Sequence, residues 1–142
     1  MGQITVEKNV GGIEGLCVIT PAVHGDHRGY FMETYSQRDM EEHGIFINFV
    51  QDNQSMSVKG VLRGLHFQKN YPQSKLVRAI HGSVFDVAVD LRPGSTTYGK
   101  WYGILLTENL AHPANLVLPE CPGYLGTLVH PGGLSVLPAA LG

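Results

Sequence analysis

Apolar and polar residues alternate over short stretches along most of the chain, and glycine, proline, asparagine or serine separates one stretch from the next. The clearest alternation spans residues 83–91, where Phe85, Val87 and Val89 share one phase and Asp86 and Asp90 share the other. A period of two is typical of β-strands. We therefore expect strands at 15–21, 30–35, 45–51, 61–68, 75–81, 83–91 and 100–107.

One stretch departs from this period. Residues 36–43 (Ser-Gln-Arg-Asp-Met-Glu-Glu-His) predict a short helix, since Ser36 can cap its start and Gly44 can end it. Residues 25–29 predict a turn. The 18 glycines are spread at turn-like intervals. Many short strands joined by tight turns favour an antiparallel β sandwich or barrel. No repeat or linker divides residues 1–142, so we expect a single domain.

Composition and charge narrow the class of protein. The 142 residues suffice for one domain with a core. The net charge is −2 and no basic block occurs, so nucleic acid is not an expected partner. The two cysteines, Cys17 and Cys121, are typical of a reducing compartment. No apolar run could span a membrane, and no signal peptide is visible. We expect a soluble cytoplasmic protein.

The last third of the chain has an unusual composition. No lysine or arginine follows Lys100, and Glu108 and Glu120 are the acidic residues after it. From residue 110 to 142 the chain is rich in proline, glycine, alanine, leucine and valine, with weak periodicity. A protein surface needs charge, so we expect this divergent tail to be buried, disordered or foreign to the fold.

Candidate chemistry centres on residues 60–68, Gly-Val-Leu-Arg-Gly-Leu-His-Phe-Gln. Arg63 and His66 are three apart, so a regular strand would point them to opposite faces. Either Gly64 makes the strand irregular and both address one space, or only one of them does. An arginine and Lys75 close to His66 would keep the imidazole neutral and able to act as a base. The alternative is that Arg63 and Lys75 are solvated charges at a sheet edge.

Other polar groups have simpler interpretations. The cluster Gln51-Asp52-Asn53-Gln54-Ser55 is typical of a turn. Arg28 and Glu33 could form a salt bridge across one face. The seven histidines have no convincing ligand spacing, so we expect no metal site.

Taken together, five segments resemble the dTDP-4-dehydrorhamnose 3,5-epimerase family. The segments are 25–33 (Gly-Asp-His-Arg-Gly-Tyr-Phe-Met-Glu), 49–55 (Phe-Val-Gln-Asp-Asn-Gln-Ser), 60–68, 74–78 (Ser-Lys-Leu-Val-Arg) and 82–92, continuing through 94–95 and 98–101. They follow the family's order and spacing from about residue 15 to 109. A short match could arise by chance, whereas five in register make the resemblance specific.

The resemblance implies an all-β antiparallel jelly roll of cupin type and a homodimer in which strands of one subunit extend the sheet of the other. It implies epimerisation of a dTDP-4-keto-6-deoxy sugar, dTDP-4-dehydro-6-deoxy-D-glucose, at C3 and C5 to dTDP-4-dehydro-L-rhamnose. In this family's chemistry His66 would be the base that removes a proton next to the C4 ketone, and Lys75 would stabilise the resulting enolate oxygen.

The resemblance also implies a set of binding residues. Arg63 would meet the sugar or diphosphate as a planar donor fork, and Arg28 would contact the diphosphate. Glu33, Gln51 and Asn53 would contact the nucleotide and sugar. No metal and no cofactor take part in the implied reaction.

The tail departs from the family's pattern. The family's acid, a tyrosine, lies about a dozen residues beyond a Gly-aromatic-Ala-His-Gly motif, and an aspartate partner of the base lies further on. Here Gly123-Tyr124-Leu125 occupies the motif's place without Ala-His. Either a one-base slip near Leu125 altered the tail, or a shortened variant is genuine. In both cases we expect the jelly roll's C-terminal strands to be incomplete.

Three functions therefore remain open. The first is an epimerase with reduced activity. The second is a sugar-nucleotide-binding remnant that lacks the tyrosine acid and turns nothing over. The third is a metal-dependent cupin enzyme, which the spacing of the histidines disfavours.

Overall fold

The computed structural model describes residues 3–111, 113–118, 126–128 and 132–139, and it describes side chains up to residue 117. One α-helix, one short 3₁₀ helix and ten strands make up this part of the chain. Their bounds are β1 Ile4–Lys8, η1 Val10–Gly12, β2 Cys17–Pro21, β3 Val23–Asp26, β4 Gly29–Met32, α1 Gln37–Glu42, β5 Asn53–Ser57, β6 Ser74–Val89, β7 Trp101–Thr107, β8 Asn115–Leu118, β9 Gly126–Leu128 and β10 Gly132–Ala139.

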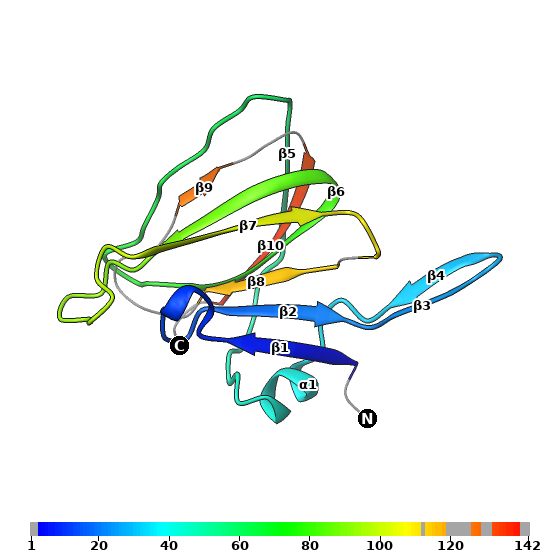
Figure 1. Ribbon diagram of the computed structural model, residues 1–142, viewed down its shortest axis with the longest axis horizontal. Coiled ribbons are helices and arrows are strands. Elements are labelled where there is room, and N and C mark those ends of the chain that lie inside the picture. The colour runs from blue at the N-terminus through cyan, green and yellow to red at the C-terminus, as the bar shows by residue number, and fades with distance from the viewer. Residues whose placement is uncertain (1–2, 112, 119–125, 129–131, 140–142) are drawn as a thin grey trace.

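The strands form a curled sheet organised around β6 (Figure 1). The first half of β6 lies in the order β1-β2-β8-β6-β10-β5, and its second half pairs with β7 on one side and β9 on the other. Every ladder in the described part is antiparallel. β3 and β4 form a separate two-stranded hairpin that projects from the body. The expected antiparallel all-β fold is confirmed.

Two apolar clusters cover the two faces of the main sheet. The first joins side chains of the main sheet, such as Val18 and Leu116, to Val84, Ala88 and Leu106 of the layer formed by β6 and β7. The second, on the opposite face, contains Cys17, Ile19, Leu76 and Val117 with Met40 of α1 and Ile45. The first cluster therefore lies between the two layers, and α1 helps to cover the outer face of the main sheet.

A register shift in β6 decides which of its residues face the interior. Along the ladder with β10, His81 pairs with Gly133 but Ala79 pairs with Leu134, so β6 carries one extra residue at Ile80. As a result Val77 and Val84, seven residues apart, belong to the same interior cluster. In the second half of β6 the fully buried residues are Val84, Asp86 and Ala88. The residues that alternate with them, Phe85, Val87 and Val89, are only half-buried.

The predicted helix is confirmed. Its N-cap residue Ser36 accepts a hydrogen bond from the Asp39 N–H at 3.3 Å, and Gly44 follows the C-cap with φ of +80°. The predicted strands at 75–81 and 83–91 are a single strand, because Gly82 remains within the ladder at φ of +69°. The strand predicted over 30–35 is shorter, as β4 ends at Met32.

The strand predicted at 45–51 is wrong. Ile45, Ile47 and Phe49 do alternate with exposed residues, and they pack against the outer cluster. The segment nevertheless pairs with no described strand, and β5 begins only at Asn53. The polar cluster that was expected to be a turn thus supplies the start of a strand.

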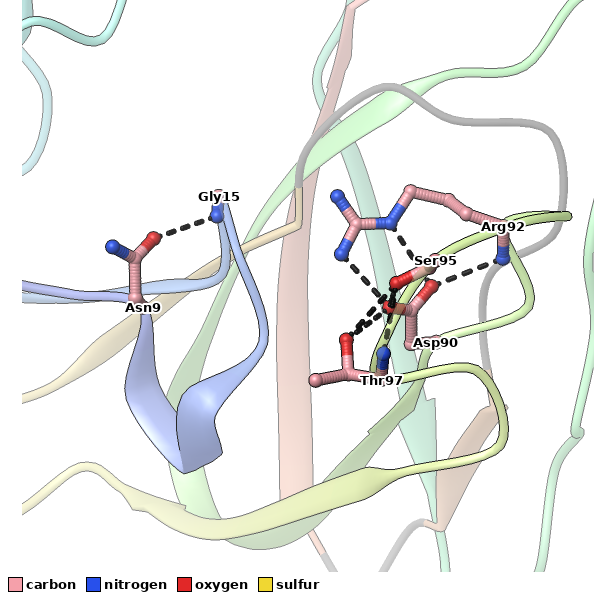
Figure 2. Close-up of polar contacts among 6 residues, drawn as sticks. All are labelled: Asn9, Gly15, Asp90, Arg92, Ser95 and Thr97. Carbon is pink, nitrogen blue, oxygen red and sulfur yellow. Dashed lines mark hydrogen bonds and ion pairs between the residues drawn. The ribbon is translucent and has the colours of Figure 1, made fainter.

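A buried carboxylate holds the loop between β6 and β7 (Figure 2). The Asp90 oxygens accept hydrogen bonds from Arg92 Nε and Nη2 at 2.9 and 2.8 Å, from Ser95 Oγ at 2.7 Å and from Thr97 Oγ1 at 2.6 Å. Nearby in the same view, Asn9 Oδ1 accepts the Gly15 N–H at 2.8 Å and closes the turn before β2. Both contacts fix loops through local side chains rather than through the sheet ladder.

Candidate active site

The segment that was expected to carry the catalytic histidine is an irregular arm between β5 and β6 (Figure 1). The strand predicted at 61–68 is therefore wrong, because only Arg63 forms an isolated bridge. Gly64 has φ of +103°, a conformation that glycine adopts without strain, so the expected irregularity is present. Arg63 and His66 are both exposed on this arm. Arg63 Nη2 donates to the Met56 carbonyl at 3.3 Å, which ties the arm to β5.

Lys75 stands at the start of β6 on the interior face. It lies two residues before Val77 in a continuous ladder with β10, so both side chains share the face that carries the interior cluster. After the register shift, Asp86 returns to that same face and is fully buried. Asp86 is a candidate site residue that sequence reasoning missed. An acid within a strongly apolar strand is the signal that could have found it.

Two further predicted residues lie next to each other. Gln51 Nε2 donates to Asn53 Oδ1 at 3.0 Å, and both side chains are exposed at the start of β5. Asn53 pairs with Val136 of β10, and Val136 pairs with Val77 on the other side. Asn53 and Val77 therefore flank β10, roughly two strand spacings or about 10 Å apart across the sheet, and Lys75 lies two residues further along β6. The structure gathers Gln51, Asn53 and Lys75 around the β5–β10–β6 part of the sheet.

Arg28 lies elsewhere, at the tip of the β3–β4 hairpin. The guanidinium pairs with Asp26, with Nη2 at 2.6 Å from Oδ2. Hydrogen bonds from Arg28 hold the pKa of the Asp26 carboxyl below its usual range. The salt bridge that Arg28 and Glu33 could have formed is not present, because the guanidinium pairs with Asp26, which is closer in the chain. Glu33 is half-buried just beyond β4. An open hollow of about 320 Å³ runs along the hairpin beside Arg28, Tyr30 and Phe31.

The predicted convergence of charges on His66 remains a prediction. Within the described residues, His66 makes no hydrogen bond to Arg63 or Lys75. No three His, Cys, Asp or Glu side chains of the described part are grouped so that they could hold a metal ion. No helix in the described part is long and apolar enough to cross a membrane. Tyr124, the aromatic hydroxyl of the tail, lies outside the described residues.

The curled antiparallel sheet, with a lysine and a buried acid on its interior face, is of the cupin jelly-roll class, and solved structures share it. One is the 3,5-epimerase of Legionella pneumophila in complex with dTDP-4-keto-L-rhamnose, with TM-score 0.86, 36% identity and coverage of 98% of this chain and 73% of that one. Another is the 3,5-epimerase of Bacillus anthracis with TDP and PPi bound, with TM-score 0.85, 33% identity and coverage of 97% and 79%.

Sequence comparison identifies the family. The family model for dTDP-4-dehydrorhamnose 3,5-epimerase matches residues 11–122, so the chain belongs to that family. The enzyme of Methanothermobacter thermautotrophicus is 57% identical over 96 residues, which cover 68% of this chain and 52% of that protein. The Escherichia coli enzyme is 55% identical over 99 residues, covering 68% and 54%. The chain thus matches only about half the length of these relatives.

Proposed function

We propose that the chain binds a dTDP-4-keto-6-deoxy sugar and epimerises it beside the ketone, as dTDP-4-dehydro-6-deoxy-D-glucose to dTDP-4-dehydro-L-rhamnose. The ketone at C4 acidifies the protons at C3 and C5. His66 removes one of them, an enolate forms, and a proton returns to the opposite face of the ring. The Lys75 ammonium stabilises the negative charge that develops on the C4 oxygen.

The remaining polar residues hold the substrate in this proposal. Arg63 offers the sugar or the diphosphate a planar pair of donors, and its bond to the Met56 carbonyl positions it at the edge of β5. Gln51 and Asn53 present amides at the same edge. Arg28 and Glu33 contact the nucleotide end. The observation that carries the proposal is the family match itself, because residues 11–122 contain all seven of these side chains.

Exchange of solvent deuterium into dTDP-4-keto-6-deoxyglucose, followed by NMR, tests the proposal. We expect exchange that falls at least about a hundredfold in His66→Ala, because removal of a general base costs that much. His81→Ala is the matched control, since His81 is also an exposed histidine and pairs with Glu108 outside the site. Equal exchange in the wild type and His66→Ala would contradict the assignment of the base.

A second candidate function is a sugar-nucleotide-binding remnant without turnover. It is favoured by one observation, that Gly123-Tyr124-Leu125 occupies the place of the family's Gly-aromatic-Ala-His motif without Ala-His. The same experiment separates the two functions. Epimerised product shows that some group returns the proton, and deuterium exchange without epimerised product shows that only the base works. Binding of the sugar nucleotide without exchange identifies the remnant.

We propose further that the protein is a homodimer. The β3–β4 hairpin pairs with no other described strand and exposes Tyr30 and Phe31. An isolated two-stranded hairpin is marginally stable in water, so a second copy would stabilise it. The hairpin projects away from the main sheet (Figure 1), so in a dimer it could bring Arg28, which lies between β3 and β4, to the partner's site. A cytoplasmic location remains a proposal that rests on the two cysteines.

A further inference from the structure

A small pocket lies at the base of the hairpin, separate from the proposed active site. Its volume is about 60 Å³. The end of β2, the base of β4, the middle of β6 and the connection from β7 to β8 surround it. The lining side chains that matter below are Tyr30, Arg78, Glu108, Asn109 and Asn115. A cavity volume of roughly 10–15 Å³ of this kind holds one water molecule, so the pocket has room for a group of a few atoms.

Two of these side chains have no partner among the side chains that the structure describes. Arg78 is half-buried, and no carboxylate of the described residues forms an ion pair with it. Asn115 is only 6% exposed, yet its side chain makes no hydrogen bond to any residue up to 117 that the structure describes. Buried polar groups are normally hydrogen-bonded, and a partly buried charge normally has a counter-ion.

Two acceptors on the pocket wall are already engaged. Glu108 Oε2 lies 2.9 Å from His81 Nδ1, so this carboxylate is directed to the histidine and not to Arg78. Asn109 Oδ1 accepts the Ala111 N–H at 2.9 Å. Among the described residues, the side-chain donors without a partner in this pocket include the guanidinium of Arg78 and the amide of Asn115, which lie opposite each other on β6 and β8.

We infer that this pocket binds a small oxyanion, the carboxylate or phosphate group of a ligand, between Arg78 and Asn115. A guanidinium offers parallel N–H groups that match two oxygens of such an anion, and an amide N–H₂ can donate to a third. Tyr30 and Met32 of β4 line the same pocket, so the bound anion also contacts the base of the hairpin.

Titration of the full chain with sodium phosphate, sodium acetate or sodium chloride at constant ionic strength tests this inference. The readout is the ¹⁵N–¹H spectrum. We expect saturable shifts at the amides of Ala79, Ile80, Ala114 and Asn115 with phosphate, with acetate or with both. A response to phosphate alone identifies a phosphate group, and a response to acetate alone identifies a carboxylate. Absence of saturation with both anions, or an equal response to chloride, overturns the inference.

Variants assign the site to its residues. Arg78→Gln should raise the dissociation constant of the anion at least about tenfold, because it removes a charge-assisted hydrogen bond. Arg38→Gln is the matched control, as Arg38 lies on α1 beside Asp39 and Glu42. Asn115→Asp places a carboxylate in the pocket wall and should abolish binding even if Arg78→Gln fails to fold. Unchanged affinity in Asn115→Asp would contradict the site.

Discussion

Two Asp-x-Arg sequences in the chain form the same contact in opposite environments. In Asp26-His27-Arg28 and in Asp90-Leu91-Arg92, the aspartate accepts hydrogen bonds from the arginine two residues later, through its backbone N–H and its guanidinium. The side chains of the first pair are 46% and 78% exposed, whereas those of the second are 0% and 18% exposed. Burial, not sequence, therefore decides what each pair contributes to stability.

Asp90→Asn should lower the free energy of unfolding by about 3 kcal/mol, as expected when one partner of a buried ion pair is removed. The Ser95 and Thr97 hydroxyls donate to one carboxylate oxygen of Asp90. In the variant, an amide N–H₂ at that position would be a donor facing two donors. Urea denaturation measures the change. Asp26→Asn is the control and should leave the midpoint nearly unchanged, because that pair is exposed. Equal effects of the two variants would contradict this account.

The pH dependence of stability follows from the same residue. The Arg92 guanidinium, with the Ser95 and Thr97 hydroxyls, holds the pKa of Asp90 far below its usual value, which is about 3.9 in an unfolded chain. A carboxyl whose pKa is lowered by folding stabilises the fold at pH values above its pKa in the unfolded chain. This stabilisation is lost as the pH falls below that pKa. Thermal melts should therefore show the gap between the wild type and Asp90→Asn narrowing below about pH 4. A constant gap down to pH 2.5 would refute this.

The side-chain chemistry of the site is predictable from sequence only in part. An irregularity at Gly64 is one of the two arrangements that the odd spacing of Arg63 and His66 allows, and the structure confirms it. The burial of Asp86 does not follow, because alternation gives two phases without saying which one faces the core. The partner of Arg28 was also not predicted. It is Asp26, two residues earlier, and such a contact across a turn forms without any tertiary structure.

At the scale of the element, α1 depends on its cap. Ser36→Ala should destabilise the protein by about 1 kcal/mol, because the Asp39 N–H loses its acceptor. Ser36→Asp should retain most of the stability, since a carboxylate caps the same N–H groups. Chemical denaturation of the three proteins measures both effects. Equal loss in the two variants would show that the hydroxyl acts through something other than capping.

The pairing of β6 with β7 depends on a glycine under an aromatic ring. A Cβ added at Gly103 would lie 2.5 Å from Phe85 Cζ. Gly103→Ala should therefore destabilise the protein by about 1–3 kcal/mol, the usual cost of overpacking. Phe85→Leu should relieve the clash, so the double variant should lose less than the sum of the single variants. Additive losses in this double-mutant cycle would contradict the contact.

Elements with local signals were predicted well, and those that depend on a distant partner were not. The helix has its cap and its terminating glycine within nine residues, so sequence suffices. Residues 45–51 have the strand period because Ile45, Ile47 and Phe49 pack on the outer cluster, but no described strand pairs with them. Residues 61–68 have strand-forming residues, but Gly64 lies at φ of +103° and the segment forms only an isolated bridge at Arg63.

At the scale of the whole molecule, the hairpin predicts the oligomeric state. Phe31→Ser should weaken the proposed dimer at least about tenfold, because exposed aromatic residues are common hot spots of interfaces. Tyr98→Ser is the control, as Tyr98 is similarly exposed but lies in the loop between β6 and β7. Sedimentation equilibrium measures both constants. A wild type that is monomeric at all concentrations would exclude the dimer.

The overall architecture was predictable because it rests on many weak signals that agree. Short alternating stretches and evenly spaced glycines indicate an antiparallel β fold, and the ordered segments of the family resemblance indicate its topology. The role of the tail was not predictable. Residues 132–139 form β10 between β5 and β6, so a stretch with weak periodicity supplies an inner strand of the main sheet.

Because of the extra residue at Ile80, odd-numbered residues face the interior in one half of β6 and even-numbered residues do so in the other. Before it, odd-numbered positions such as Lys75 and Val77 face the interior, and after it even-numbered positions such as Val84 and Asp86 do. Deletion of one residue here would give β6 one continuous alternation. Every side chain in one half of the strand would then point to the opposite face of the sheet. Length changes in this strand are therefore tolerable only in pairs, and a mutational scan should show opposite odd–even rules on the two sides of Ile80.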